Sequence, residues 1–118
     1  MPTVIFVVDD DHDIRVELRN TLEQAGYHVY SASDGASALN LLAQIPAPAL
    51  ILLDMQMPVM NGAQFIAAVT KLPELRDVPI IQISSSPHAH AATRHHLVKP
   101  FDEATLLKTV RGCLAGKP

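Results

Sequence analysis

The stretch TVIFVVDDD at residues 3–11 joins an uninterrupted aliphatic and β-branched run to three consecutive aspartates. A run of this kind is typical of a strand that is buried on both faces of a parallel sheet. Because chemistry in an open α/β sheet gathers at the carboxyl ends of the strands, the residues that follow such runs are candidates for a shared site. Three later apolar runs also end on a reactive side chain: residues 50–53 precede Asp54, residues 80–83 precede Ser84 and residues 97–98 precede Lys99.

Strand and helix patterns alternate along the chain. The predicted strands are residues 3–8, 28–32, 49–53, 79–83 and 96–98. The predicted helices are residues 12–25, a segment after an N-cap at Asp34, residues 63–72 before Pro73, and a segment after an N-cap at Asp102. This alternation predicts an α/β fold, namely a flavodoxin-like, doubly wound, five-stranded parallel sheet of order 2-1-3-4-5. In that order strands one and three are neighbours, which brings Asp54 beside Asp9 and Asp10.

Composition limits the possible functions. A chain of 118 residues that is 48% hydrophobic but only 4% aromatic predicts a single domain, residues 1–118, around an aliphatic core. The formal net charge of -3 argues against direct nucleic-acid binding. The sequence lacks a bilayer-spanning stretch and a signal-peptide pattern, so we expect a cytoplasmic protein with no membrane partner. Its one cysteine, Cys113, cannot form an intramolecular disulfide and should face the core.

Clustered carboxylates favour a bound divalent cation. Two unit charges ~4 Å apart repel by roughly 4 kcal/mol at an effective dielectric constant of 20, and a cation removes that cost. Hard oxygen ligands point to Mg²⁺, with Mn²⁺ as an alternative. An aspartate in such a site can attack phosphorus, while an ammonium and a hydroxyl stabilise the transferring group. The residues that fit these roles are Asp9, Asp10, Asp54, Ser84 and Lys99.

Four blocks of the sequence carry a resemblance to a known family: VVDD at 7–10, LLDMQMPVMNG at 52–62, PIIQIS at 79–84 and VKPF at 98–101. Together they resemble the receiver domain of bacterial two-component response regulators. The second block is highly specific, and the Lys99-Pro100 pair adds independent weight. Since the blocks occur in order over essentially the whole chain, the resemblance implies the CheY-like form of the flavodoxin fold and a phosphoacceptor function in a two-component system or phosphorelay.

The resemblance also implies which residues hold the metal ion. Asp54 would be both the phosphoacceptor and a ligand of Mg²⁺. Asp10 would bind the ion directly, and Asp9 mainly through water. The backbone carbonyl of Gln56 would complete the set of protein ligands.

Further residues would contact the phosphoryl group. Lys99 would pair with it, presented by a cis peptide bond before Pro100. The Ser84 hydroxyl would move toward it, and the Ser85 backbone amide would reach one of its oxygens. The implied phosphodonor is a phosphohistidine on a sensor histidine kinase or on a histidine phosphotransfer protein. The output would be changed binding to a downstream protein or to a fused output domain.

The chain departs from the family before its last strand. Only fourteen residues separate Ser84 from Lys99, which is about two helical turns fewer than most receivers have. A βαβ crossover needs at least about 10–12 residues, and Pro87 hinders an early helix start. We therefore predict that the fourth helix of the family is missing or reduced to a turn or two, and that dimerisation through the usual face built on it is in doubt.

His96 is a second departure from the family. His96 stands where receivers usually carry a Tyr or Phe that swings inward with the hydroxyl residue. Because imidazole is smaller and titrates near neutrality, we expect a switch of Ser84 and His96 that is weakly coupled, without loss of phosphorylation. His88, His90 and His95 crowd the same segment, but their irregular spacing favours a polar loop over a transition-metal site.

Other functions fit the residues less well. A phosphatase with an aspartyl nucleophile needs an acid two residues further on, where Gln56 stands, so we expect self-phosphotransfer and slow autodephosphorylation but no enzyme turnover. A flavodoxin-like nucleotide binder needs glycine, serine or threonine after the first strand, where residues 9–11 would repel a phosphate. A receiver-fold scaffold that works without phosphorylation stays open as an alternative, because the crossover is short.

Overall fold

The computed structural model describes residues 3–57, 59–85 and 95–115. Its strands are β1 (Val4–Val8), β2 (His28–Ala32), β3 (Leu50–Asp54), β4 (Ile80–Ser84) and β5 (His95–Val98). Its helices are α1 (His12–Gln24), α2 (Gly35–Leu42), α3 (Gly62–Thr70) and α4 (Glu103–Leu114). The strands form one parallel sheet of order β2-β1-β3-β4-β5, which confirms the predicted flavodoxin-like topology.

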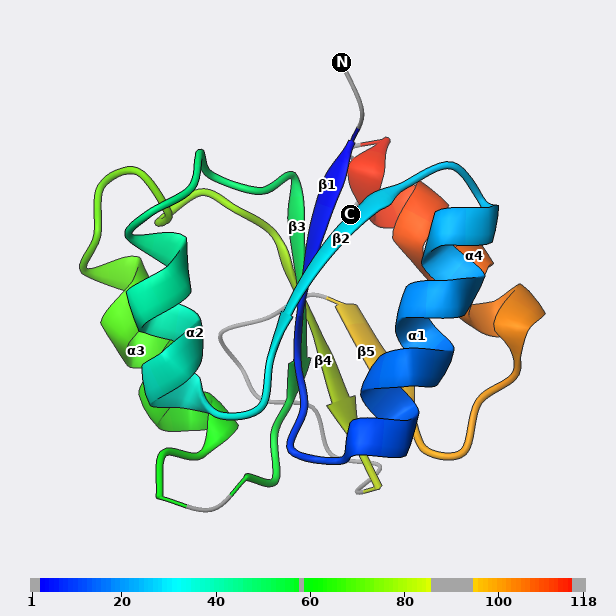
Figure 1. Cartoon of the computed structure of the whole chain (residues 1–118), viewed down its shortest axis with the longest axis horizontal. Coiled ribbons are helices and arrows are strands. Elements are labelled where there is room, and N and C mark those ends of the chain that lie inside the picture. The colour runs from blue at the N-terminus through cyan, green and yellow to red at the C-terminus, as the bar shows by residue number, and fades with distance from the viewer. Residues whose placement is uncertain (1–2, 58, 86–94, 116–118) are drawn as a thin grey trace.

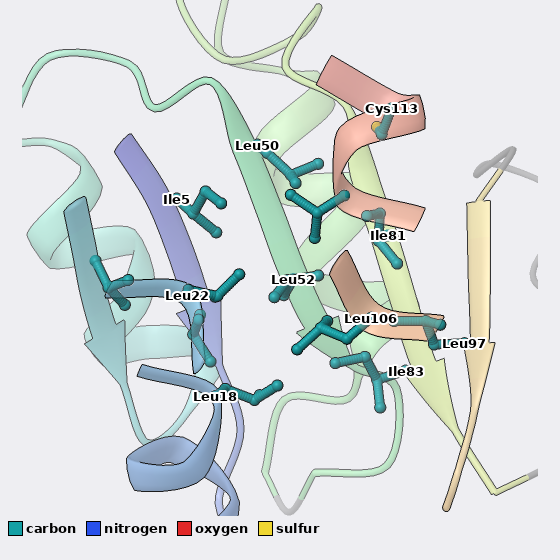
Figure 2. Close-up of a cluster of buried hydrophobic side chains, with 13 residues drawn as sticks. Ile5, Leu18, Leu22, Leu50, Leu52, Ile81, Ile83, Leu97, Leu106 and Cys113 are labelled. Carbon is teal, nitrogen blue, oxygen red and sulfur yellow. The ribbon is translucent and has the colours of Figure 1, made fainter. Parts of the chain in front are cut away.

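Helices cover both faces of the sheet, with α2 and α3 on one face and α1 and α4 on the other (Figure 1). Figure 2 shows the aliphatic cluster between the sheet and α1 and α4, where Leu22 and Leu106 lie against Leu52 of the central strand. The opposite face has its own cluster, to which α3 contributes Phe65. Successive residues of a strand point to opposite faces of the sheet. Because helices cover both faces, all five residues of β3 are buried. The aliphatic core and the buried Cys113 are as predicted.

Side-chain caps fix where the helices begin. Asp11, Asp34 and Asp102 each accept a hydrogen bond from a backbone amide in the first turn of α1, α2 and α4. The caps at Asp34 and Asp102 were predicted from the sequence. A capping box between Asn61 and Gln64 begins α3 and was not anticipated.

The third helix is shorter than the sequence analysis predicted. We expected it to reach residue 72, but α3 ends at Thr70 with Lys71 as its cap. The Leu72 amide donates to the carbonyl of Val69, a tighter bond than the helical one. The physical reason is Pro73, because a proline disfavours helical backbone angles at the residue before it.

We predicted that the fourth helix of the family is missing or shortened in the crossover from β4 to β5. That prediction falls on residues 86–94, which lie outside the described residues, as do His88 and His90. On either side of the crossover, Ser84 of β4 pairs with Val98 of β5. Among the described residues, no helix is long and apolar enough to cross a bilayer.

Candidate phosphoacceptor and metal site

Three carboxylates converge at the carboxyl ends of β1 and β3. Val8 of β1 pairs with Leu53 of β3. The next residue of each segment, Asp9 just after β1 and Asp54 at the end of β3, therefore lies beside the other. With Asp10 they form a group in which one oxygen of each residue lies within 4.8 Å of the others. Asp9 and Asp54 are 0% and 2% exposed, whereas Asp10 is exposed. The neighbourhood predicted from the strand order is therefore present, with two of its three charges buried.

Asp9 is held at three points. Its amide donates to the carbonyl of Ala32 at 3.2 Å. Its Oδ1 accepts the Asp11 amide at 2.9 Å, and its carbonyl accepts Nη1 of Arg15 at 2.7 Å. These bonds fix both the backbone and the carboxylate of Asp9 at the turn between β1 and α1.

Lys99 supplies a positive charge to the cluster. Its Nζ lies 3.5 Å from Oδ2 of Asp9 and 3.8 Å from Oδ1 of Asp54. The Lys99-Pro100 peptide bond is cis, as the resemblance implied. The Lys99 amide donates to the carbonyl of Ser84 at 2.8 Å, which extends the pairing of β5 with β4 and places the lysine stem at the sheet edge.

The buried position of Asp54 raises its pKa from 3.8 to about 6. Burial is the largest cause, and the negative charge of Asp9 adds to it. The Gln56 amide, which donates to Asp54 Oδ1 at 3.0 Å, and the Lys99 ammonium act in the opposite direction. The single positive charge of Lys99 does not neutralise the three carboxylates. A set of closely spaced carboxylate oxygens fits a hard divalent cation.

Ser84 and Ser85 lie at the end of β4, beside the cluster. Ser84 is buried and is the last residue of the strand. Ser85 is exposed, and its hydroxyl donates to Oε1 of Gln56 at 2.9 Å, with its amide 3.5 Å from the same oxygen. The amide that we predicted to reach a phosphoryl oxygen therefore faces the Gln56 side chain in this structure.

His96 lies on β5, in register with Gln82 of β4. Its ring is partly buried, and Nε2 is a buried atom that has no hydrogen-bond partner among the residues that the structure describes. A buried imidazole nitrogen without a partner costs free energy, because it loses its hydration. His95, the other histidine of the crowded segment that the structure describes, is also on β5.

Two contacts at the site were missed by sequence reasoning. Arg15 lies four residues after the cap of α1, and this position turns its guanidinium back toward the end of β1. The sequence analysis gave a role only to the backbone carbonyl of Gln56, yet the Gln56 side chain accepts a hydrogen bond from the Ser85 hydroxyl. The helical spacing from Asp11 to Arg15 was a readable signal for the first contact. No local pattern signals the second, because it joins residues that are far apart in the sequence.

A five-stranded parallel sheet with acidic, hydroxyl and lysine side chains at its carboxyl edge is the arrangement of a phosphoacceptor domain of the doubly wound class. The sequence model of the response regulator receiver domain matches residues 5–111, and the chain belongs to that family. Receiver domains are signalling modules that interact with histidine kinases and output domains.

The chain is 34% identical to the protein PilH of Pseudomonas aeruginosa, over 95% of this chain and 98% of PilH. The structure of the chemotaxis response regulator CheY4 of Vibrio cholerae is similar, with a TM-score of 0.87 and 34% identity over 94% of this chain and 98% of CheY4. The transcriptional regulatory protein PrrA of Mycobacterium tuberculosis is 33% identical, and the chain spans about half of its length, 49%.

Proposed function

We propose that this receiver domain takes a phosphoryl group onto Asp54 from a phosphohistidine of a sensor histidine kinase or a histidine phosphotransfer protein. The observation that carries the proposal is the convergence of Asp9, Asp10 and Asp54 with the ammonium of Lys99. In the transfer, an Asp54 carboxylate oxygen forms a bond to phosphorus. The bond from phosphorus to the donor imidazole nitrogen breaks, and the electron pair leaves with the imidazole.

The metal ion of this proposal is Mg²⁺. Asp9, Asp10, Asp54 and the backbone carbonyl of Gln56 would hold it, Asp9 mainly through water. When bound, the ion supplies positive charge that screens the carboxylates from the incoming phosphoryl oxygens. The all-oxygen donor set favours hard ions such as Mg²⁺ and Mn²⁺ over soft transition-metal ions.

The remaining side chains act on the transferred group. Lys99, within 4 Å of both buried carboxylates, pairs with phosphoryl charge that arrives at Asp54. Ser84 donates its hydroxyl and Ser85 its backbone amide to phosphoryl oxygens. For the amide to do so, the Gln56 side chain must release Ser85. Slow hydrolysis of the acyl phosphate then resets the domain.

Signalling follows from changed binding to a downstream protein or to a fused output domain. Movement of Ser84 toward the phosphoryl group alters the end of β4, which is paired with β5. We propose that His96 couples to this movement more weakly than a Tyr or Phe would. A His96→Tyr variant should enlarge the chemical-shift changes that a phosphate mimic causes on β5, and unchanged shifts would remove the basis for this role.

The proposal is tested by intact mass spectrometry after incubation with acetyl phosphate and Mg²⁺. We expect the wild type to gain the mass of one phosphoryl group and Asp54→Asn to gain none. Asp11→Asn is the matched control, because Asn caps a helix as well as Asp does and Asp11 is not part of the carboxylate group. It should be labelled like the wild type.

The gain should disappear when EDTA replaces Mg²⁺. No gain at any Mg²⁺ concentration would refute the phosphoacceptor function and indicate a receiver-fold scaffold. Equal labelling of the wild type and Asp54→Asn would place the phosphoryl group on another residue.

A further inference from the structure

Arg15 joins helix α1 to the backbone of the acidic site. Its Nη1 donates to the carbonyl oxygen of Asp9 at 2.7 Å, in a partly buried position. Its Nη2 lies 3.5 Å from Nδ1 of His12 on the exposed side of the helix. A hydrogen bond from a guanidinium to a carbonyl is charge-assisted and stronger than a neutral one.

The Asp9 carbonyl is part of the peptide unit that links Asp9 to Asp10. Because a peptide unit is planar, a bond that fixes this carbonyl also fixes the direction in which the chain enters Asp10. The Asp11 amide meanwhile holds the Asp9 carboxylate at 2.9 Å. Asp10 itself is exposed and its side chain lies next to the Asp54 carboxylate, so the direction of its backbone decides how its carboxylate faces the cation site.

We propose that Arg15 is a positioning residue for the divalent cation: by clamping the Asp9 carbonyl it sets Asp10 in the orientation that binds Mg²⁺. This inference rests on the proposed function, since it takes Asp10 as a ligand of the ion. Arg15 does not touch the ion in this scheme and acts through the peptide between the two aspartates.

The positioning role and a purely electrostatic role predict opposite changes. A fixed positive charge close to a cation site repels the cation, so removing the charge alone would tighten Mg²⁺ binding. Removing a clamp that orients a ligand weakens binding, and loss of such outer contacts typically costs ~10- to 100-fold in metal affinity. The sign of the change therefore separates the two roles.

Arg19 offers a matched control on the same helix. Its Nη1 donates to the carbonyl of Val29 at 3.1 Å and its Nη2 to the Ser31 hydroxyl at 3.2 Å. It therefore ties α1 to β2, away from the carboxylates, whereas Arg15 ties α1 to the residue that follows β1. Any general effect of cutting a helix-to-strand contact should appear in both Arg15→Met and Arg19→Met.

The experiment is isothermal titration calorimetry of Mg²⁺ into the wild type, Arg15→Met, Arg15→Lys and Arg19→Met. We expect Arg15→Met to bind Mg²⁺ at least ~10-fold more weakly, Arg15→Lys to fall between it and the wild type, and Arg19→Met to match the wild type. With acetyl phosphate, saturating Mg²⁺ should restore the labelling rate of Arg15→Met, because Asp54 is unchanged.

Unchanged or tighter Mg²⁺ binding by Arg15→Met would overturn the positioning role while leaving the phosphoacceptor function intact. Equal weakening in Arg19→Met would also overturn it, because the effect would then be one of general stability. If circular dichroism shows that Arg15→Met is unfolded, Arg15→Lys decides, and wild-type affinity in that variant would refute the proposal. A wild type that binds no Mg²⁺ would overturn both the metal site and the inference built on it.

Discussion

The Asp54→Asn substitution should stabilise the metal-free protein at neutral and alkaline pH. Burial and the neighbouring Asp9 charge raise the pKa of Asp54 from 3.8 to about 6 in the folded state. The folded protein therefore binds more protons than the unfolded chain between these two pH values, so the free energy of unfolding falls as the pH rises through this window. Each pKa unit corresponds to ~1.4 kcal/mol, which gives on the order of 3 kcal/mol above pH 6.

Asparagine removes the charge and keeps an oxygen that can accept the Gln56 amide. We therefore expect Asp54→Asn to raise the free energy of unfolding by up to about 3 kcal/mol at pH 8 in EDTA. The gain should shrink as the pH falls from 6 toward 4. Because the chain has no tryptophan, urea unfolding is best followed by far-ultraviolet circular dichroism. Mg²⁺ should stabilise the wild type more than the variant, since it binds the folded state.

Asp34→Asn is the control for this experiment. Asp34 is partly exposed, and its hydrogen bond from the Ser37 amide lowers its pKa. Its contribution to stability is thus present above pH 3.8 and lost as the pH falls, which is opposite in sign to that of Asp54. Asp34→Asn should bring no gain at pH 8. If Asp54→Asn is no more stable than the wild type at pH 8 in EDTA, or if its gain does not depend on pH, the conclusion that burial and the Asp9 charge destabilise the Asp54 carboxylate is wrong.

Three further outcomes follow from local geometry. A Cβ atom at Gly62 would meet the backbone of Met55 at 2.7 Å, whereas one at Gly112 would meet nothing within 4 Å. Gly62→Ala should therefore lower the free energy of unfolding by ~1–3 kcal/mol, and Gly112→Ala, in a helix, should raise it by ~0.5–1 kcal/mol. Paired urea titrations measure both changes. Val59 has a φ of 68° and is 99% exposed, so Val59→Gly should relieve ~1 kcal/mol of backbone strain, and a lower melting temperature would contradict this. Gln56→Ala removes the acceptor that faces the Ser85 amide and hydroxyl. Beryllofluoride, a phosphate mimic, should therefore bind ~2- to 10-fold more tightly, as measured by calorimetry. Unchanged affinity would show that Gln56 does not compete with a phosphoryl oxygen for Ser85.

The site was predictable where it depends on strand order. Each reactive residue directly follows or ends a buried apolar run, and a parallel sheet places all such ends at one edge. That is why Asp9, Asp54 and Lys99 could be placed together from the sequence. In the structure, Lys99 Nζ lies within 4 Å of a carboxylate oxygen of each aspartate. The caps at Asp34 and Asp102 were also readable, because a cap and its first turn are neighbours in the chain.

Tertiary structure decided the contacts between residues that are distant in sequence and face each other only after folding. The bridge from Gln56 to Ser85 joins two loops that no local pattern relates. The pKa of Asp54 depends on burial by the whole sheet and on a charge from another strand. The early end of α3, by contrast, is a local effect. The backbone preference of the residue before Pro73 outweighed the apolar periodicity that favoured a longer helix.

The sequence by itself determined the layout of this protein: five buried strands, their alternation with helices, and the residues that stand at the strand ends. The apolar periodicity and the alternation of strands with helices suffice for this, because backbone geometry sets the repeat at which side chains face the core. Only the tertiary structure decided how those residues are held and charged, from the Arg15 clamp on Asp9 to the burial of Asp54. Hydrogen bonds and desolvation depend on distances of a few ångströms between distant segments, and such distances exist only once both faces of the sheet are packed.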